Sequence, residues 1–405
     1  TELLREGGYT GRIIDADHFP TDGAPFTPPP AAGPHDPAVI LFTSGTTGQV
    51  KGAVLSHRNI ITGIMSIQMA GMMVLHNTAR NMGVPVEQIL AHIPQQATLL
   101  VYPLFHISGL GASFLSPFLS GTKVVILPKW DAGEAAKKIA DEGVTMLSVV
   151  PTMLWDMLHK AKLADFNLSS LRNIGTGGQA LPINLLDEMR AACPDAVMGT
   201  GYGMTETAGS IAMALGEDFI RNRGSAGRIL PLMDVRIEGD DGAPLPTGQA
   251  GEIVVRGAQV MLGYWEQPDA TAAVMTDDGW MRTGDVGYLD EEGYIFIVDR
   301  KKDMVISGGE NIYCAEVERA LSEMPAITEC ATFGIPDDRL GELLVAVVRG
   351  AGVDEGAVIA HVANRLARYK APAHVAVVAT PLPRNHLDKV DKIALRAAWP
   401  DLFKG

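Results

Sequence analysis

Apolar runs alternate with amphipathic segments over most of the chain. Short, largely apolar runs predict strands that are buried on both faces of a sheet, and they occur at residues 38–42, 99–102, 123–127 and 146–150. Residues 133–141 and 183–192 have the spacing of amphipathic helices. From about residue 227 the pattern changes to short strands joined by Gly, Pro and Asp turns, at residues 235–237, 251–255 and 294–297. The predicted fold class is α/β, with stacked sheets and helices.

A smaller α+β unit is predicted after the charged run at residues 299–303, with a helix at residues 315–321. We therefore expect a large domain over residues 1–301 and a small, mobile domain over residues 302–405, with a hinge between them. Residues 1–37 are rich in Pro and Gly, a composition typical of loops and linkers.

The composition and net charge of the chain argue against some classes of binding partner. The chain has 405 residues, of which 47% are apolar, and a formal net charge of −14. This balance argues against nucleic acid or an anionic membrane as the main partner. Three scattered cysteines, Cys193, Cys314 and Cys330, have no metal-ligand spacing and predict reduced thiols in a cytoplasmic enzyme. The uncharged stretch at residues 59–79 is interpreted as a buried core helix and not as a membrane span.

A segment rich in Gly, Thr and Ser follows the first apolar run. Its residues are Thr43, Ser44, Gly45, Thr46, Thr47 and Gly48, followed by Lys51 and Gly52. The glycines let several backbone N–H groups converge on one point, and the hydroxyls and the ammonium group can bind phosphate oxygens there. The spacing is not that of a Walker loop. A polar turn is the alternative, but the length of the segment favours a phosphate-binding loop.

Seven further motifs follow in order: PLFHISG at 103–109, GTGGQAL at 175–181, GYGMTET at 201–207, RTGD at 282–285, DRKKD at 299–303, MVISGGENIY at 304–313 and PRNHLDKVDK at 383–392. Together with the phosphate loop, they resemble the motifs of the adenylate-forming (AMP-binding) superfamily, which includes acyl-CoA synthetases. The resemblance runs from Ala38 to Arg396.

The resemblance implies a reaction in two steps. A carboxylic acid attacks the α-phosphate of ATP, bound with Mg²⁺, to give acyl-AMP and pyrophosphate, and CoA then displaces AMP. The PLFHISG motif lacks the Asp that holds a substrate amine in peptide-synthetase domains, which argues against an amino-acid substrate. An adenylation protein that loads a carrier-protein thiol and a non-catalytic relative stay open as alternatives.

The resemblance also implies the site residues. Lys389, Thr205, Glu206 and His106 are the expected catalytic residues, and Glu206 is also the expected Mg²⁺ ligand. Lys302 is the expected hinge, and Gly308 and Gly309 are expected to line the CoA tunnel. The expected ATP-binding residues are Thr43, Ser44, Gly45, Thr46, Thr47, Gly48, Lys51, Gly178, Gln179, Ala180, Tyr202, Gly203, Met204, Thr205, Asp285, Ile297, Arg300 and Lys389.

Two features depart from the family pattern. Asp388 replaces the Gly that usually precedes the catalytic lysine, which predicts an altered loop and a weaker electrostatic effect of Lys389. Only 42 residues precede the phosphate loop, whereas family members carry a sizeable region there, so we expect part of the N-terminal region to be missing.

The expected walls of the acid pocket are mostly apolar and suit a fatty, aryl or polycyclic acid. They are residues 106–111, 149–155, 177–179 and 199–204.

Overall fold

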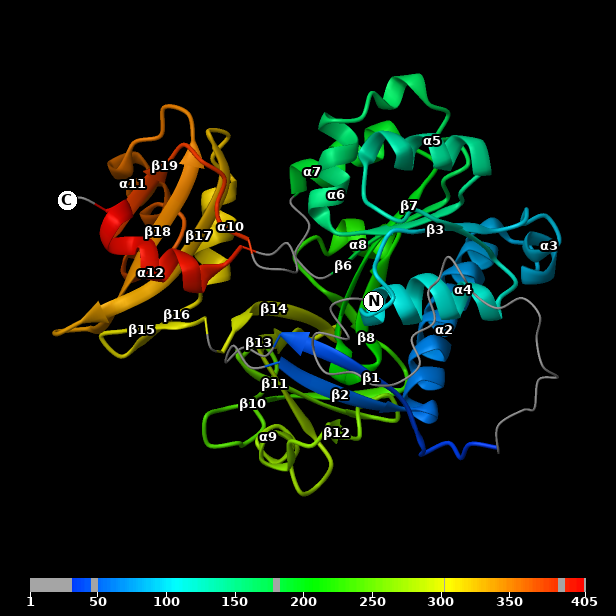
Figure 1. Ribbon diagram of the computed structural model, residues 1–405, viewed down its shortest axis with the longest axis horizontal. Coiled ribbons are helices and arrows are strands. Elements are labelled where there is room, and N and C mark those ends of the chain that lie inside the picture. Colours follow the sequence, from blue (N-terminus) through cyan, green and yellow to red (C-terminus); the bar gives the residue numbers. More distant parts are fainter. Residues whose placement is uncertain (1–30, 45–49, 178–182, 302, 385–389, 404–405) are drawn as a thin grey trace, which may run out of the picture.

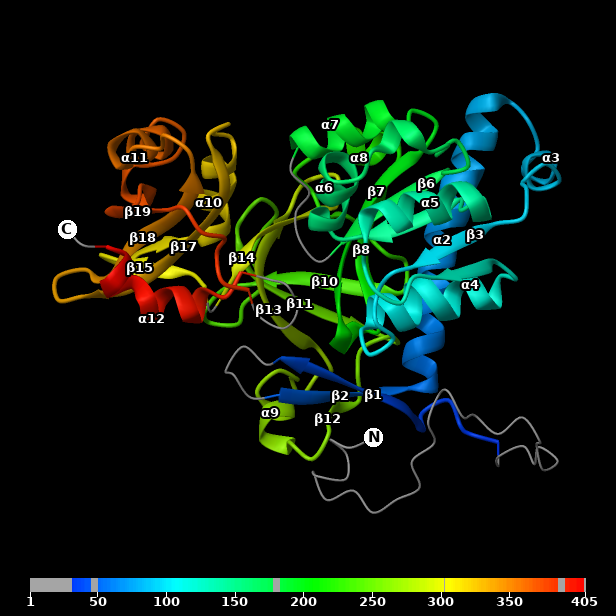
Figure 2. The ribbon, with the colours of Figure 1, turned by 45° about the horizontal axis from the view of Figure 1, so that its top comes forward.

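Two bodies lie side by side in the protein, a large one up to residue 301 and a small one from residue 303 (Figures 1 and 2). The computed structural model describes residues 31–44, 50–177, 183–301, 303–384 and 390–403. The large body holds a three-stranded and an eleven-stranded sheet, and the small body holds a five-stranded sheet. The predicted α/β class of stacked sheets and helices is confirmed.

One half of the eleven-stranded sheet is parallel and is packed against helices. Its strands are β3 (Ala97–Leu100), β4 (Lys123–Ile126), β5 (Met146–Val149), β6 (Asn173–Gly177) and β7 (Val197–Met204), in the order β7-β6-β5-β3-β4. The helices whose side chains share its core are α5 (Ala132–Glu142), α6 (Pro151–His159) and α7 (Ile183–Ala192). Burial of β4 on both faces is a wrong prediction. This strand is at the edge of the sheet, where Ile126 is 57% exposed.

The other half of this sheet is antiparallel. It consists of β8 (Gly209–Leu215), β9 (Gly227–Ile229), β10 (Met233–Glu238), β11 (Gly251–Gly257), β13 (Met281–Leu289) and β14 (Tyr294–Arg300), in the order β10-β11-β13-β14-β9-β8. Because β8 pairs with β7, the two halves join at the strand that carries residues 201–204. The shorter elements of the large body are α3 (Val86–Leu90), η2 (Ser108–Leu115), α4 (Ser116–Leu119), η3 (Leu163–Asp165), η4 (Thr205–Thr207), α8 (Glu217–Arg221) and α9 (Pro268–Ala272).

The two strands that flank the predicted phosphate loop belong to the small sheet of the large body. Here β1 (Pro37–Ser44) and β2 (Val50–Ser56) form an antiparallel pair, and β12 (Gly263–Tyr264) pairs with the other side of β2. The strand prediction for residues 38–42 is confirmed, but its burial is wrong. Since β1 is an edge strand, Leu41 is buried and Phe42 is 64% exposed.

Helix α2 (His57–Met82) contradicts the prediction of a buried core helix. A capping box between Ser56 and Asn59 begins it, and Gly83 in the left-handed conformation ends it. One side packs against the large body through residues such as Gly63 and Ile64, whereas Met73 on the other side is 55% exposed. Among the described residues, α2 is the one helix long and apolar enough to span a membrane, and a single such helix is weak evidence for a span.

The small body encloses cores on both faces of its sheet. In β18 (Gly341–Gly350), Leu344, Ala346 and Val348 face one core, while Val345 and Val347 face the other, as strand geometry requires. Its other strands are β15 (Val305–Ser307), β16 (Glu310–Ile312), β17 (Ile327–Asp337) and β19 (His374–Val378). Its helices are α10 (Cys314–Ser322), α11 (Glu355–Ala363), η5 (Arg368–Lys370) and α12 (Lys392–Leu402).

Candidate active site

The phosphate-loop strands bring Thr43 opposite Lys51. The two residues are register partners on β1 and β2, and the Thr43 hydroxyl donates to the Lys51 carbonyl oxygen at 3.4 Å. The Lys51 ammonium lies over the ring of Tyr264, 4.9 Å from its centroid. Ser44 is the last residue of β1. The two strands therefore present the ends of the loop, and Lys51, at one point of the large body.

A tight turn after β7 carries the next two candidates, Thr205 and Glu206. They form the single turn η4, which ends at Ala208 with a positive φ of 49°. Glu206 is 8% exposed. One of its carboxylate oxygens accepts a hydrogen bond of 2.9 Å from the Tyr264 hydroxyl, and its carbonyl oxygen accepts one of 2.8 Å from the Met261 N–H. The predicted metal ligand is thus held at both its main chain and its side chain.

Two of the expected ATP-binding residues, Tyr202 and Arg300, contact a third, Asp285, and each of the three lies on a different strand. The Tyr202 hydroxyl donates to Asp285 Oδ2 at 2.8 Å, and Arg300 Nε lies 3.0 Å from Oδ1. Asp285 and Arg300 are register partners on β13 and β14, which explains their approach. Burial, and then the Asp285 charge, raise the pKa of Tyr202 well above its ordinary value. The structure therefore brings together three of the expected ATP-binding residues at one place, called here the ribose corner because the family resemblance implies that Asp285 and Arg300 bind the ribose.

The glycines of β7 have a packing role that the sequence did not reveal. A Cβ on Gly203 would lie 2.0 Å from the Gly209 carbonyl oxygen, and one on Gly199 would lie 2.3 Å from Leu215. Close approach of the β8 backbone therefore requires the glycine at 203, whereas at 199 a Cβ would meet the movable end of the Leu215 side chain and lie 3.0 Å from the Ala214 carbonyl oxygen. Their small size is explained by strand packing and does not by itself indicate room for a bulky acid.

His106, Ile297 and Met204 occupy different surroundings. His106 follows Pro103 in the loop before η2, and its ring is tilted against that of Phe105 at 4.6 Å between centroids. Ile297 lies on β14 and packs, like Met204, against the core of the antiparallel half. The roles of these three residues stay predictions.

Several expected site residues lie outside the described residues. They are Gly45, Thr46, Thr47, Gly48, Gly178, Gln179, Ala180, Lys302 and Lys389. The same holds for Asp388. Their roles stay predictions.

Gly308 and Gly309 form the two-residue turn between β15 and β16. Both have positive φ, 61° and 87°, which hairpin turns of this length require. The tight turn therefore explains both glycines without reference to CoA, and the CoA-tunnel role stays a prediction.

Strand β14 connects the nucleotide residues to the small body. Arg300 binds Asp285, whereas the preceding Asp299 accepts a 3.1 Å hydrogen bond from the N–H of Ala315 at the start of α10. Neighbouring residues of a strand point to opposite faces. Strand β14 therefore contacts the ribose corner through Arg300 and the small body through Asp299, at the junction between the two bodies. Burial raises the pKa of Asp299 to about 6, although the N–H groups of Arg300 and Ala315 act in the opposite direction.

The small body holds a partly buried ion pair. Lys392 Nζ lies 2.8 Å from Glu318 Oε1, and that carboxylate also accepts the N–H of Thr332 at 2.7 Å. Burial is the largest single influence and lowers the pKa of Lys392, but the charge and hydrogen bond of Glu318, together with the Cys314 and Asp303 groups, outweigh it and the net shift is upward. The three cysteines are free, as predicted. Burial raises the pKa of Cys193 to about 11 and that of Cys314 to about 12.

The donor set around Glu206 fits a magnesium ion. Mg²⁺ is bound in proteins through one or two carboxylates together with substrate phosphates, and Glu206 supplies one carboxylate beside the phosphate-loop strands. Among the described residues there is no group of three or more His, Cys, Asp or Glu side chains that could hold a metal. Phosphate oxygens would therefore have to complete the coordination.

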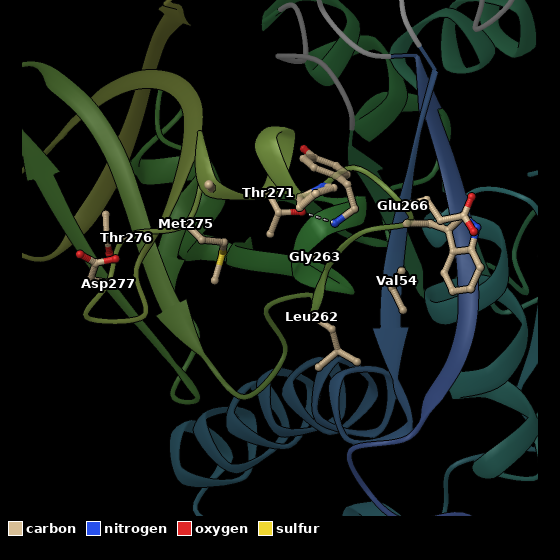
Figure 3. A pocket seen from close by; sticks show the side chains of 12 residues that line it. Val54, Leu262, Gly263, Glu266, Thr271, Met275, Thr276 and Asp277 are labelled. Carbon is tan, nitrogen blue, oxygen red and sulfur yellow. Dashed lines mark hydrogen bonds between the residues drawn. The ribbon is translucent and has the colours of Figure 1, made fainter.

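Tyr264 is a contact residue of the site that the sequence interpretation missed. It contacts Lys51 and Glu206, which precede it by 213 and 58 positions, so only the pairing of β12 with β2 brings it there. An open pocket of about 600 Å³ lies beside β12, and its lining includes Tyr264 but neither Glu206 nor Asp285 (Figure 3). This pocket is therefore distinct from the ribose corner formed by Tyr202, Asp285 and Arg300.

Lys51, Glu206 and the Tyr202–Asp285–Arg300 cluster offer an ammonium group, a carboxylate and a set of hydrogen-bonding groups of the kinds that bind phosphate, a metal ion and a ribose. The family model described as "AMP-binding enzyme" matches residues 7–265, and that described as "AMP-binding enzyme C-terminal domain" matches residues 316–389. The chain belongs to the AMP-binding enzyme family. This confirms the resemblance inferred from the motifs.

The relatives are CoA ligases and CoA synthetases. Indoleacetate–CoA ligase of Aromatoleum aromaticum is 41% identical over 371 residues, which cover 91% of this chain and 68% of the relative. Feruloyl-CoA synthase of an Amycolatopsis species is 38% identical, covering 90% and 71%. The chain is accordingly an enzyme of the AMP-forming ligase type.

Solved structures agree with this assignment. ATP-bound MatB of Rhodopseudomonas palustris has a TM-score of 0.78 at 32% identity and covers 92% of this chain and 70% of its own. The o-succinylbenzoate CoA synthetase of Bacillus subtilis, in complex with its acyl-adenylate, has a TM-score of 0.76 at 34% identity, covering 92% and 71%.

Proposed function

We propose that the protein is an ATP-dependent acyl-CoA ligase for a hydrophobic carboxylic acid of the aryl, fatty or polycyclic class. The observation that carries this proposal is the cluster of Tyr202, Asp285 and Arg300, with Glu206 four residues beyond Tyr202, in a chain of this family. A carboxylate whose two oxygens already bind a hydroxyl and a guanidinium group is suited to accept the two hydroxyls of a ribose.

The proposed reaction is the one that the family resemblance implies. The substrate carboxylate forms a bond to the α-phosphorus of ATP and pyrophosphate leaves; the thiol of CoA then attacks the acyl carbonyl and AMP leaves. Lys51 and the Thr43–Ser44 strand end bind the β- and γ-phosphates, Thr205 donates to the α-phosphate and Lys389 neutralises charge as the carboxylate attacks. Mg²⁺ bound at Glu206 would withdraw negative charge from the phosphates. The reduced thiols suit a cytoplasmic enzyme.

The acid class rests on the relatives and on the apolar residues near the expected pocket. The names of relatives include ligases for indoleacetate, ferulate, a fused-ring propanoate and long-chain fatty acids. Phe105 and Trp155 are 65% and 46% exposed in or beside the expected walls. Large exposed aromatic side chains are suited to bind an apolar acid.

The two steps require different groups of the small body. Lys389 and the Gly308–Gly309 turn belong to this body, so we propose that it rotates about Lys302 between adenylation and thioester formation. Support comes from β14, whose Asp299 contacts α10 while Arg300 contacts the ribose corner. A rotation that begins after residue 301 leaves the Arg300–Asp285 pair intact and breaks the Asp299–Ala315 contact.

A panel of acids with Mg·ATP and CoA tests the function. The panel contains short, medium and long fatty acids, aryl acids and sterol-type acids, and mass spectrometry detects acyl-CoA and AMP. Acyl-CoA from one hydrophobic acid is the expected result. ATP–pyrophosphate exchange without formation of acyl-CoA would contradict the CoA step and indicate a carrier-protein thiol as the acceptor. The lack of both exchange and acyl-CoA with every acid of the panel would contradict the proposal as a whole.

A further inference from the structure

We propose that Tyr264 is a positioning residue of the phosphate site, which orients Glu206 through its hydroxyl and Lys51 through its ring. The inference rests on the proposed function, because it takes Glu206 and Lys51 as the groups that meet the phosphates and the metal of Mg·ATP. Tyr264 belongs to none of the motifs that identified the site.

The side chain of Tyr264 links two charges of opposite sign. Its hydroxyl donates to Glu206 Oε1 at 2.9 Å, and the Lys51 ammonium lies 4.9 Å from the centroid of its ring. A hydrogen bond to a carboxylate is stronger than one between neutral groups, and an ammonium group is attracted to the face of an aromatic ring at this distance. One side chain therefore restrains both groups.

The main chain around Tyr264 is bound to the same two elements. The N–H groups of Leu262 and Trp265 donate to the carbonyl oxygens of Val54 and Gly52 on β2, at 2.9 and 2.7 Å. The Met261 N–H donates to the carbonyl oxygen of Glu206 at 2.8 Å. Residues 261–265 thus connect the strand that carries Lys51 to the turn that carries Glu206.

A contact on the far side fixes the backbone at Tyr264. Its N–H donates to the Thr271 hydroxyl at 2.9 Å, the hydrogen bond drawn in Figure 3. At Gly263, whose φ is 149°, a Cβ would lie 2.8 Å from Thr271, so the glycine allows this approach. The segment is therefore held from both sides, and the position of the Tyr264 ring follows from it.

This arrangement has a consequence for the charges. Lys51 and Glu206 do not form an ion pair with each other in the part of the chain that the structure describes; each instead contacts Tyr264. A direct Lys51–Glu206 pair would neutralise both groups and would have to break before phosphate and metal could bind. Tyr264 keeps the ammonium available for phosphate and the carboxylate available for the metal.

Two substitutions separate the two contacts. Tyr264→Phe removes the bond to Glu206 and keeps the ring below Lys51, whereas Tyr264→Leu removes both. Tyr294→Phe is the matched control, because its hydroxyl also donates to a carboxylate, that of Asp218 on α8. Calorimetry measures the affinity for ATP with excess Mg²⁺ and with EDTA, and thermal unfolding reports the stability of each variant.

Tyr264→Phe should weaken binding of Mg·ATP about tenfold and change that of metal-free ATP less than about twofold, because only the Glu206 contact is lost. Tyr264→Leu should weaken both forms, and Tyr294→Phe should weaken neither. Equal loss of both forms in Tyr264→Phe, or no loss, would overturn the inference, whatever its melting temperature. A wild-type protein that binds no ATP would instead overturn the proposed function, so the two failures are distinguishable.

Discussion

The large and the small body hold their site residues in different ways. In the large body, Asp285 is bound by Tyr202 and Arg300 from two other strands, and Glu206 is bound by Tyr264. The small body meets this site at a junction, where Asp299 accepts the N–H of Ala315. This difference supports the proposal that the large body holds a nucleotide site organised before the substrates bind, and that the small body changes the groups presented to it.

The largest effect on activity is expected from substitution of Lys389, the lysine that the small body would bring to the site. Lys389→Ala should slow acyl-AMP formation by about 10² to 10³-fold, because one preorganised positive group at the α-phosphate is lost. Rapid-quench measurement of acyl-AMP checks this. The exposed residue Arg339 of the same body serves as the control in Arg339→Ala. Adenylation at the wild-type rate in Lys389→Ala would refute the assigned role.

Asp285→Ala should have the next largest effect. It removes the expected acceptor of the ribose hydroxyls and leaves Tyr202 and Arg300 without their partner, so kcat/KM for ATP should fall about 10²-fold. Steady-state kinetics with varied ATP measures this, with the exposed Asp195→Ala as control. An unchanged kcat/KM would show that the cluster is structural and that the ribose binds elsewhere.

Glu318→Gln should destabilise the small body. It leaves the ammonium of Lys392 partly buried beside a neutral amide, so the free energy of unfolding should fall by about 2 kcal/mol, less than for a fully buried pair. Chemical denaturation measures the change. Glu323→Gln breaks the exposed pair with Arg365 and should cost less than about 0.5 kcal/mol. Equal effects of the two substitutions would contradict this difference in burial.

The remaining prediction concerns the pH dependence of stability at the junction between the two bodies. The pKa of Asp299 is about 6 in the folded protein, above its ordinary 3.8, because the carboxyl is buried. Between these values the folded state binds more protons than the unfolded state, so this group lowers stability as pH rises from about 4 to 6. In Asp299→Asn that decline should disappear. Denaturation at several pH values measures it, and parallel curves for the two proteins would show that Asp299 titrates normally.

The sequence located seven of the nineteen strands in the described residues, and the family motifs named the three residues of the Tyr202–Asp285–Arg300 cluster. Apolar runs located β3, β5 and β14, and the RTGD and DRKKD motifs contain Asp285 and Arg300. Burial was predicted less well. Whether a strand is at an edge, as β1 and β4 are, depends on the order of strands in the sheet and not on its own residues.

Two further features depend on contacts between distant segments. Helix α2 exposes large apolar side chains such as Ile61, Met65 and Met73, so its composition did not reveal which residues face solvent. Tyr264 reaches Lys51 and Glu206 only because β12 pairs with β2 across more than 200 residues of sequence. Spacing within a short motif carries no information on such a contact.

The central claim is that the small body rotates at Lys302 and so brings different residues to the site for adenylation and for thioester formation. Separate measurement of the two half-reactions in Lys302→Pro tests this claim most directly. Proline restricts the backbone dihedral angle that a hinge must change, whereas Lys302→Ala removes the charge and keeps this freedom. The account predicts that Lys302→Pro forms acyl-AMP at close to the wild-type rate and no longer transfers the acyl group to CoA, while Lys302→Ala performs both steps. Equal loss of both half-reactions in Lys302→Pro, or normal CoA transfer, would contradict it.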